Sequence, residues 1–567
     1  MKYKLLTLLA VIMPIITSAQ EKGLDQKIDE AFKPVSDFFS NVIFFTIPFF
    51  GTEAPFVLLL LVTSAAFFTI YFGFPNVRFF AKAINTVRGK YEDIEKHGAQ
   101  NLYGEDGIAQ GQDLTNVDIE DHLVQMENDL AVDGDIVDTI RDESSDGEVS
   151  HFQALATAVS GTVGNGNIAG VALAIALGGP GATFWMIVCG LLGMSTKFVE
   201  CTLGVQYRDV GEDGTVYGGP MYYLSKGLGE RGYKKLGKVA AIVFAVFCIG
   251  GSFGGGNAAQ SNQATIVLKE LFNMQSAASG AIVGLVLATL VGIIIIGGIK
   301  RIAQVTEKVV PFMAVMYVVA CLYIIFANFS YVDDAISLIV TEAFNPKAIG
   351  VGGVIGVLLV GFKRAAFSNE AGAGSASIAH SAVRTKYSAS EGLVALLEPF
   401  IDTVLICTMT ALVIIIFNFG GFFEYGLDVS TDGSGAVQIG NEVVQGAGIT
   451  AKAFAEYIPF SDVFLTIAVV LFAVSTMISW SYYGLQSWKF LFGRGKVADL
   501  TYKILFLTFV VIGAAASMGS IWAFSDAMIF AMVFPNMVGL FFLFPVVKKQ
   551  LNRYLDAIKL KYDAIEE

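Results

Sequence analysis

Apolar stretches long enough to cross a membrane recur along this chain and constrain its fold more than any other feature. A run of about 20 apolar residues spans the hydrocarbon core of a bilayer as one α-helix. Eleven candidate spans are present, at 55–74, 152–178, 181–205, 237–266, 278–298, 308–328, 349–378, 392–419, 461–491, 501–517 and 520–547. Hydrophobic residues make up 54% of the 567 residues and charged residues only 15%, a composition that excludes a soluble domain. The sequence therefore predicts an all-α polytopic membrane protein.

The ends of the chain and its loops predict an orientation. Residues 1–19 combine a basic start, a short apolar core and a small-residue cleavage site, typical of a signal peptide, with a short uncleaved helix as the alternative. Alternate loops are rich in Lys and Arg, whereas the opposite loops between spans carry only Lys269, Lys347 and Lys452. Basic loops remain in the cytoplasm. We therefore expect a multi-pass protein of the bacterial cytoplasmic (inner) membrane, with the segment 20–54 in the periplasm and the tail 548–567 inside.

An acidic segment, 91–150, follows the first span and its basic flank (55–90). It holds 18 Asp and Glu residues against Lys96 and Arg141, and it contributes much of the net charge of -13. Such a composition cannot bury much apolar surface. We interpret the segment as a solvated cytoplasmic linker, with a regulatory or cation-sensing arm as the alternative.

Glycine interrupts two of the spans, at corresponding positions in the two halves of the chain. The first broken segment reads SGTVGNGNIAG (160–170) and the second reads FSNEAGAGSA (367–376). Backbone that leaves the helical conformation inside a bilayer cannot face lipid, so it must line a cavity or bind something. Paired breaks of this kind indicate the binding site of a secondary transporter.

The first broken segment contains the groups that a zwitterion and a cation require. Gly161, Gly164 and Gly166 each disfavour the helix by roughly 1 kcal/mol, and Asn165 and Asn167 place amides in the middle of the span. An unwound turn there would present N–H groups at the start of the next half-helix, suited to a carboxylate. Carbonyl groups at the end of the preceding half-helix would suit Na⁺. The alternative interpretation is a glycine face that packs closely on another helix.

The second broken segment places Asn369 and Glu370 within the membrane. An ionisable group at this depth is costly and indicates a functional or structural role. Glu370 could hold a cation, titrate, or fix the unwound turn through hydrogen bonds, and Lys363 and Arg364 are its candidate partners.

Two further spans carry polar groups at mid-membrane. Ser475 and Thr476 are adjacent hydroxyls, and Trp480 lies one helical turn later on the same face. This arrangement suits the polar head and the apolar wall of a small ligand, although such hydroxyls often bond back to their own helix. Gln260 supplies an amide from the 237–266 span.

The remaining chemistry-bearing residues indicate no reaction. Lys197 and Glu200 are interpreted as a structural i,i+3 ion pair. The histidines, which are dispersed and outside the centre of the bilayer, and the scattered cysteines predict neither a metal site nor a disulfide. Sequences typical of ATP-binding loops, zinc proteases and serine hydrolases are absent from the chain. We therefore expect no enzymatic activity, no organic cofactor and no nucleic-acid partner.

Several long strings closely resemble the alanine or glycine:cation symporter family, also called the sodium:alanine symporters. They are GTVGNGNIAGVALAIALGGPGATFWM (161–186), GMSTKFVECTLGVQYR (193–208), YGGPMYYL (217–224), GFKRAAFSNEAGAGSASIAH (361–380) and STMISWSYYG (475–484). The resemblance covers roughly 54–92 and 147–547. It implies a fold similar to the leucine transporter, within a transporter core at 151–547. The core would contain two inverted five-helix repeats (152–328 and 349–517) and a last helix (520–547), with 55–74 as the extra N-terminal helix.

The resemblance also implies Na⁺-coupled import of alanine or glycine by alternating access. The implied substrate-binding residues are Thr162, Gly164, Asn165, Gly166, Asn167, Gln260, Phe367, Thr476 and Trp480. The implied Na⁺ ligands are the carbonyls of Gly161 and Gly164 and the hydroxyls of Ser475 and Thr476. Asn165 and Ala371 depart from the expected family pattern, which leaves the substrate less defined than the family. Transport of another small zwitterion, coupling to protons, and a receptor that binds without transporting remain the alternatives.

Overall fold

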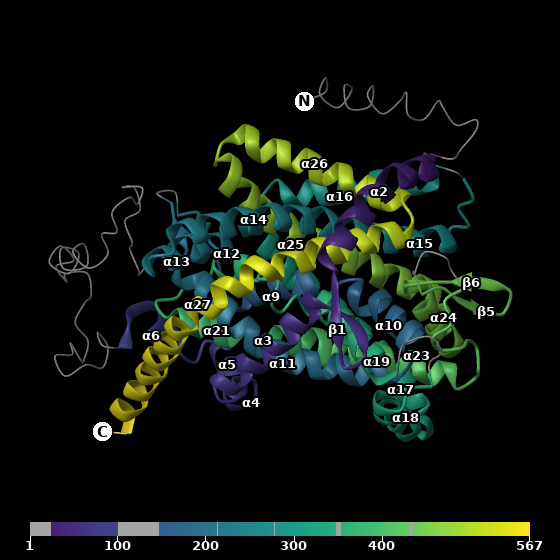
Figure 1. Ribbon diagram of the computed structural model, residues 1–567, viewed down its shortest axis with the longest axis horizontal. Helices are drawn as coiled ribbons and strands as arrows, with labels where there is room; N and C mark the ends of the chain where they lie inside the picture. The colour runs from purple at the N-terminus through teal and green to yellow at the C-terminus, as the bar shows by residue number, and fades with distance from the viewer. Residues whose placement is uncertain are drawn as a thin grey trace.

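The computed structural model describes residues 24–99, 147–211, 214–276, 278–347, 353–429 and 435–566. Within these ranges the chain is a bundle of packed helices with three short β-hairpins (Figure 1). The predicted signal peptide and most of the acidic segment 91–150 lie outside the described residues.

Helices long and apolar enough to cross a membrane dominate the described residues. Seven pass this test: Gly181–Gln206 (α11), Lys234–Leu271 (α14 to α15), Gly298–Ala327 (α17), Ser388–Asn418 (α21 to α23), Ser461–Phe492 (α25), Lys496–Ala515 (α26) and Met518–Asp563 (within α27). A bent pair, His151–Thr162 (α9) with Gly166–Gly178 (η2 and α10), would be an eighth. Phe56–Tyr71 (α3) and Ser279–Ile295 (α16) are shorter apolar helices. The chain is thus polytopic and helical, while the count of eleven spans and the inverted repeats stay predictions.

Further helices and hairpins connect these spans, and some of the spans contain breaks. The remaining helices are α2 (Leu24–Ile43), α4 (Pro75–Arg78), α5 (Phe80–Val87), α6 (Glu92–His97), α12 (Pro220–Tyr222), η3 (Tyr223–Gly227), α13 (Leu228–Glu230), η5 (Phe329–Tyr331), α18 (Val332–Phe344), α19 (Gly353–Asn369), α20 (Ser377–His380) and α24 (Ala447–Tyr457). Inside longer spans lie η2 (Gly166–Gly170), α10 (Val171–Gly178), α14 (Lys234–Phe253), η4 (Gly254–Ala258), α15 (Ala259–Leu271), α21 (Ser388–Ala395), α22 (Leu397–Pro399), η6 (Phe400–Cys407) and α23 (Thr408–Asn418). The antiparallel hairpins pair β1 (Thr46–Phe49) with β2 (Thr52–Pro55), β3 (Asp209–Val210) with β4 (Val216–Tyr217), and β5 (Val437–Ile439) with β6 (Glu442–Val444).

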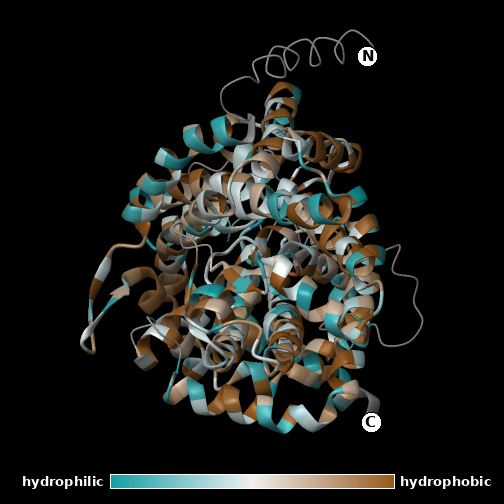
Figure 2. Ribbon diagram, turned by 90° about the vertical axis from the view of Figure 1, so that its right-hand side faces the viewer, coloured by the Kyte–Doolittle hydropathy of each residue, from teal (hydrophilic) through white to brown (hydrophobic). Residues whose placement is uncertain are grey.

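The outer surface of the bundle is apolar, as expected of a protein embedded in lipid. Large side chains such as Ile293, Phe312, Val319 and Ile467 are at least half exposed. Figure 2 shows hydrophobic residues on peripheral helices as well as in the interior. In water such a surface would aggregate, so these faces fit contact with acyl chains.

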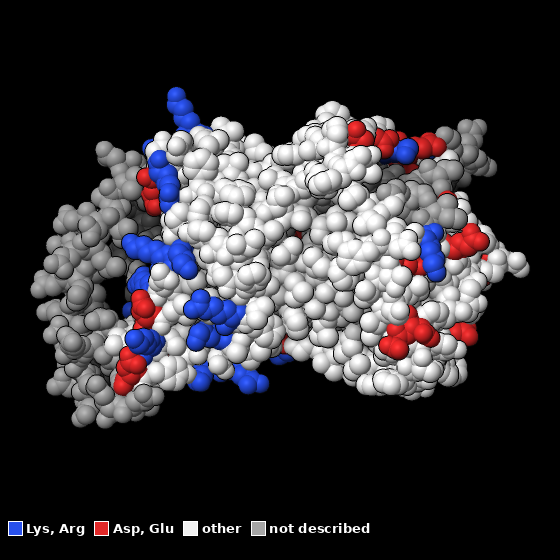
Figure 3. All heavy atoms as spheres, turned by 60° about the horizontal axis from the view of Figure 1, so that its bottom comes forward, with Lys and Arg blue, Asp and Glu red and all other residues white. Residues whose placement is uncertain are grey.

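Charged residues gather at the two ends of the molecule. On the face seen in Figure 3, Lys and Arg dominate the left end, Asp and Glu dominate the right end, and a broad zone between them is almost uncharged. The left end is the one at which α27 finishes, and β5 and β6 lie toward the right end (Figure 1). The separation agrees with the loop asymmetry that the sequence contains.

The last helix is longer than predicted. The expected span ended at residue 547, but α27 continues from Met518 to Glu566, a length of 49 residues. Val547, Leu551, Tyr554 and Ile558 are buried at helical spacing, so the apolar face continues beyond the membrane-length stretch. The segment 548–567 is therefore helical and continuous with the last span, and its place in the cytoplasm stays a prediction.

Candidate functional site

The first broken segment is interrupted where its glycines lie. Helix α9 ends at Thr162, and the chain bends by 51° before η2 begins at Gly166. Side chains replace the missing helical partners there, since the N–H of Gly164 donates to Asn167 Oδ1 over 2.9 Å. The N–H of Asn165 donates to Gln260 Oε1, also over 2.9 Å.

Asn165 offers an unused acceptor at this point. Its Nδ2 donates to the carbonyl oxygen of Gln260 over 3.2 Å. Its Oδ1 is buried and has no hydrogen-bond partner among the described residues. Buried polar atoms are normally paired, so this oxygen is available to a donor or a cation beside Gly164.

Helix α25 is hydrogen-bonded to the end of α9 beside Gly164. The hydroxyl of Thr476 donates to the carbonyl of Ser160 over 3.1 Å, and the hydroxyl of Ser160 donates to the carbonyl of Ser475 over 2.8 Å. A Cβ on Gly164 would lie 2.4 Å from Thr476 Oγ1. The segment therefore requires glycine here because the two chains approach so closely.

Two of the expected hydroxyls bond to their own helices instead. Ser475 donates to the carbonyl of Phe472 over 3.0 Å, and Thr162 makes long bonds to the carbonyls of Ala158 and Val159. For Ser475 this is the back-bond that the sequence left open as an alternative. Only Thr476 of the two adjacent hydroxyls on α25 reaches across to α9.

The second broken segment leaves the helical conformation after Asn369. Glu370, Gly372 and Gly374 all have positive φ, at 55°, 94° and 87°. A left-handed residue other than glycine is uncommon and needs support from its surroundings. That support comes from two donors to the Glu370 carboxylate, the hydroxyl of Ser375 and the indole N–H of Trp480, the latter at 2.9 Å.

The expected pairing of Glu370 with Lys363 or Arg364 is wrong. Both basic side chains bind Asp526 on α27, Lys363 over 2.9 Å. Helix α19 directs this face toward α27, whereas Glu370 lies beyond the helix end, where the backbone has turned away. The contacts of Glu370 therefore fit a structural role, in which its carboxylate fixes the unwound turn.

Trp480 also explains the glycine run at 250–256. A Cβ on Gly256 would lie 2.1 Å from Trp480 Cγ, and one on Gly251 would lie 3.2 Å from its six-membered ring. The glycines let α14 and η4 approach the indole, which is 1% exposed. The run is therefore a close-packing surface next to both broken segments.

Asp402 is a central residue that the sequence interpretation missed. Its Oδ1 accepts hydrogen bonds from Asn167 Nδ2 at 2.6 Å and from the hydroxyl of Ser368 at 3.1 Å. Its Oδ2 accepts from Thr403, whose hydroxyl also accepts from Asn369 Nδ2. The carboxylate therefore joins the first broken segment to the second. The signal that could have found it is the one that identified Glu370, an acid inside an apolar span.

A chain of buried ionisable groups runs from α11 to α6. Lys197 pairs with Glu398 over 3.0 Å, and His380 lies between Glu398 and Glu391. Glu391 also binds His151, the first residue of α9, whose other ring nitrogen is 2.8 Å from a carboxylate oxygen of Glu95 on α6.

This row of buried ionisable groups corrects two expectations. Lys197 does not pair with Glu200, which accepts a 2.7 Å hydrogen bond from Asn536 instead. His151 and His380 are not dispersed, because both bind Glu391. Neighbouring helices supply closer partners than the same helix does, and spacing along one helix cannot reveal them.

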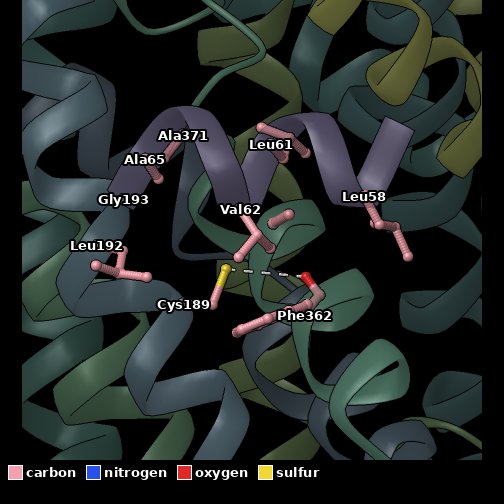
Figure 4. A pocket seen from close by; sticks show the side chains of 10 residues that line it. Leu58, Leu61, Val62, Ala65, Cys189, Leu192, Gly193, Phe362 and Ala371 are labelled. Atoms are coloured by element: carbon pink, nitrogen blue, oxygen red, sulfur yellow. Dashed lines mark hydrogen bonds between the residues drawn. The ribbon is translucent and has the colours of Figure 1, made fainter. Parts of the chain in front are cut away.

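Two cavities lie near the broken segments. The first, of about 20 Å³, is apolar and is bounded by α3, α11 and α19, with Ala371 at its edge (Figure 4). The second, of about 140 Å³, is lined by Lys363, Arg364, Trp522 and Asp526 together with apolar residues. Neither of the two is lined by the predicted substrate residues.

Phe367 and Trp522 both contact the first broken segment, and Trp522 also lines the larger cavity. The ring of Phe367 stacks on Trp522 with a centroid separation of 5.1 Å. A Cβ on Gly166 would lie 3.7 Å from Phe367 Cδ1. A Cβ on Gly170 would likewise lie 3.4 Å from the Trp522 ring, so both aromatic rings pack directly on the first broken segment.

A polytopic helical bundle in which two interrupted spans meet over buried polar groups has the features of a membrane transporter. A profile of the sodium:alanine symporter family matches residues 125–567. This chain belongs to the sodium:alanine symporter family, and it is a transporter rather than an enzyme.

Individual relatives agree with this assignment. The sodium/alanine symporter AgcS of Methanococcus maripaludis is 41% identical over 415 residues, covering 73% of this chain and 86% of that protein. The putative sodium/proton-dependent alanine carrier protein YrbD of Bacillus subtilis is 37% identical over 410 residues (71% and 81%). The probable sodium/glutamine symporter GlnT of the same species is 32% identical over 423 residues (74% and 82%).

Among solved structures, MhsT in complex with L-phenylalanine aligns with a TM-score of 0.46 at 14% identity, covering 73% of this chain and 99% of that one. A manganese transporter of Eremococcus coleocola aligns with a TM-score of 0.45 at 13% identity, covering 76% and 97%.

Proposed function

We propose that this protein is a Na⁺-coupled symporter that imports small neutral amino acids, alanine or glycine, by alternating access. The observation that carries the proposal is the junction of the two broken segments, with the unpaired Oδ1 of Asn165 beside Gly164. Family membership supports the coupling ion and the substrate class.

Each part of the substrate has a proposed partner in the first broken segment. The N–H of Gly166, at the start of η2, lies at the positive end of a half-helix and suits the carboxylate. Asn165 Oδ1 accepts a hydrogen bond from the ammonium. Phe367 and Trp480 provide aromatic walls that limit the side chain to a small size.

The coupling ion has a proposed place at the end of α9. The N–H of Asn165, which would be the helical partner of the Gly161 carbonyl, donates to Gln260 instead. The Gly164 carbonyl accepts from the N–H of Asn167 over 3.1 Å and retains a second lone pair, and Thr476 adds a hydroxyl from α25. Oxygen ligands of this kind suit Na⁺. One Na⁺ moving through about 100 mV releases roughly 2.3 kcal/mol, and a tenfold gradient adds about 1.4 kcal/mol. Together they support roughly a few hundredfold accumulation, so one ion is sufficient.

Proteoliposomes containing the purified full-length protein test this function. We expect an inward Na⁺ gradient to drive uptake of labelled alanine, replacement of Na⁺ by choline to abolish it, and alanine and glycine to compete best in a panel of amino acids. Full uptake in choline would favour the second candidate, proton coupling, for which the buried carboxylates of Glu370 and Asp402 are available. Binding without counterflow of labelled alanine would indicate a receptor.

The proposed orientation in the cytoplasmic membrane places α2 outside and the end of α27 inside. It rests on the Lys and Arg asymmetry of the loops and of Figure 3. A cysteine introduced at the exposed Asp37 should react with a membrane-impermeant maleimide in intact cells. One introduced at the exposed Lys559 should react only after lysis, and the reverse result would invert the topology.

A further inference from the structure

Five buried side chains at the start of α9 form a connected set of acids and imidazoles, here named the histidine–glutamate cluster. Its members are Glu95 on α6, His151 on α9, His380 on α20, Glu391 on α21 and Glu398 on α22. Lys197 on α11 pairs with Glu398 and closes the cluster at one end. None of these side chains is more than 10% exposed. The proposed binding of substrate and Na⁺ uses none of them.

His151 contacts a carboxylate with each of its ring nitrogens. Nδ1 is hydrogen-bonded to Glu391, and Nε2 lies 2.8 Å from Glu95 Oε2. A neutral imidazole carries one N–H, so its other nitrogen would direct a lone pair at an oxygen that has only lone pairs. Both contacts are satisfied when one further proton is present, on the ring or on either carboxyl group. The closed packing around His151 therefore holds a bound proton.

His380 repeats this arrangement. Its Nδ1 is 2.5 Å from Glu391 Oε1, and its Nε2 faces Glu398 Oε2 over 3.5 Å, an ion-pair distance. Neither Nε2 nor Glu398 Oε2 has a hydrogen-bond partner among the described residues. A proton on Nε2 gives Glu398 Oε2 the positive neighbour that this oxygen otherwise lacks.

The charges of the cluster balance only when both imidazoles are protonated. Three carboxylates then alternate with two imidazolium ions and the ammonium of Lys197. With neutral imidazoles the three carboxylates would face one positive charge, which leaves an excess of two negative charges. An uncompensated charge is strongly unfavourable in a buried site. The closed packing therefore favours two bound protons.

Other ionisable groups on the neighbouring elements do not replace these protons. The acids would only add negative charge, and they are Glu200 on α11, Glu307 on α17, Glu370 after α19 and Asp402 on η6. The exposed or partly exposed bases are screened by water, and they are Lys82, Lys308, Arg384, Lys386 and Arg553. The buried Arg208 donates to the backbone carbonyls of Ser381 and Val383. The phenol of Tyr554 on α27 donates to Glu95.

The cluster lies at the end of the molecule where Lys and Arg dominate. Helix α6 and the end of α27 are both found there (Figures 1 and 3). In the proposed orientation this end faces the cytoplasm, and the cluster holds the start of α9 against α6 and α21. Release of a substrate to this side requires α9 to separate from its neighbours. The imidazoles then meet water, in which the pKa of an imidazole is about 6.5.

We propose that the histidine–glutamate cluster is a proton-binding site through which cytoplasmic pH controls opening of the protein toward the cytoplasm. The closed packing binds two protons that the opened arrangement gives up, so acid favours closure and alkali favours opening. The protons enter and leave on the same side, so they are not carried across the membrane. The effect on uptake rests on the proposed function, whereas the opening itself is measurable without a substrate.

Distances measured by double electron–electron resonance in nanodiscs test the opening directly. Spin labels are attached to the full-length protein through Phe152→Cys on α9 and Lys559→Cys on α27, both at exposed positions. Cys189 is replaced by Ser, because it is the one partly exposed cysteine of the described residues. We expect a short distance at about pH 5.5 and a growing population of longer distances at about pH 8, on the two sides of the imidazole value.

Two variants and a control assign the response to the cluster. His151→Gln removes the titrating ring, so its distances should no longer change with pH. Glu95→Gln keeps the ring but removes one of its two acids, so the midpoint should move to lower pH by at least about one pH unit. It decides the question if His151→Gln is not monodisperse in size-exclusion chromatography. The matched control is His97→Gln, at an exposed histidine of the same helix as Glu95, which should keep the full response.

Uptake connects the cluster with transport. In proteoliposomes oriented as in the cell, Na⁺-driven alanine uptake should rise at least about threefold when the internal pH is raised from about 6 to about 8 at constant external pH. Each proton released changes an equilibrium by up to about tenfold per pH unit. An acid exterior without Na⁺ should drive no uptake, and uptake under that condition would overturn the proposal that the protons stay on one side.

The outcomes separate the two proposals. Distances that do not change with pH when His151 and Glu95 are both intact, together with normal Na⁺-driven uptake, overturn the proton-binding site and leave the proposed function intact. An unaltered pH response in both His151→Gln and Glu95→Gln also overturns the site, as does uptake that follows external instead of internal pH. Distances that change with pH in a protein that takes up neither alanine nor glycine support the site and overturn the proposed function.

Discussion

The amide nitrogen of Asn167, in the first broken segment, donates a 2.6 Å hydrogen bond to the carboxylate of Asp402. The same oxygen accepts a hydrogen bond from Ser368 in the second broken segment. One buried acid thus connects two stretches of backbone about 200 positions apart in the sequence. Any rearrangement that separates the broken segments must change the contacts of this carboxylate.

Replacement of Asp402 by Ala should strongly impair transport. Asn167, Ser368 and Thr403 would lose their acceptor, and hydrogen bonds to a charged group contribute about 1.5–3 kcal/mol each. We expect Na⁺-driven alanine uptake in proteoliposomes to fall at least about tenfold, the change that about 1.4 kcal/mol produces. Asp334→Ala, at an exposed acid of α18, is the control and should transport normally. Unimpaired uptake by Asp402→Ala would remove the acid from the mechanism.

Two glycines of the first broken segment should differ in their tolerance of a methyl group. A Cβ at Gly164 would approach Thr476 Oγ1 to 2.4 Å and Gln260 Oε1 to 3.0 Å, whereas the nearest atom to one at Gly166 is 3.6 Å away. Gly164→Ala should therefore abolish alanine binding, and Gly166→Ala should retain it. Titration of labelled alanine into both purified variants makes the comparison. Equal affinities would show that the close approach of α25 is unimportant.

Trp480 should limit the size of the transported amino acid. Trp480→Ala removes a fully packed indole, which destabilises a protein by about 3–5 kcal/mol, and it should admit valine or leucine while weakening alanine. Trp480→Phe keeps an aromatic wall but loses the hydrogen bond to Glu370. It should keep the preference for alanine with a lower melting temperature. Competition of alanine uptake by valine and leucine measures this, and identical profiles for all three proteins would exclude Trp480 from the substrate wall.

The buried ion pair of Lys197 and Glu398 should be sensitive to removal of one partner. Both side chains are inaccessible to solvent, and an uncompensated buried charge costs about 3–5 kcal/mol. Lys197→Met should therefore lower the melting temperature in detergent sharply. Lys226→Met breaks a partly exposed pair with Asp209 and should have a small effect, since such pairs contribute about 0–1 kcal/mol. Similar melting temperatures for the two variants would contradict the assigned burial.

Local features of the fold were predictable, because glycine and polar residues within an apolar span disfavour the helical backbone at their own positions. The interruptions after Thr162 and after Asn369 follow from such residues. The contacts of Lys363 and Arg364 were not predictable in this way. Their partner Asp526 is 162 positions from Arg364, and only the packing of α19 on α27 brings them together.

In the candidate site, too, some contacts were predictable from the sequence and others were not. Gln260 and Thr476 contact the first broken segment, while the substrate-binding role that the resemblance implies for them stays a prediction. The link between His151 and His380 through Glu391 involves three separate parts of the chain. Spacing within one helix could not have revealed it. Asp402 differs from both cases, because an acid inside an apolar span is visible in the sequence itself.

Helix α27 is longer than a bilayer requires, and its C-terminal part contacts other elements of the fold. At 49 residues it is about 70 Å long, more than twice the roughly 30 Å of the hydrocarbon core. Its final turns place the hydroxyl of Tyr554 2.5 Å from Glu95, the carboxylate that also holds the first residue of α9. Truncation after residue 547 would keep the whole predicted span, yet it would remove Tyr554 and with it a hydrogen bond to the carboxylate that holds the first residue of α9, the half-helix that ends at the first broken segment.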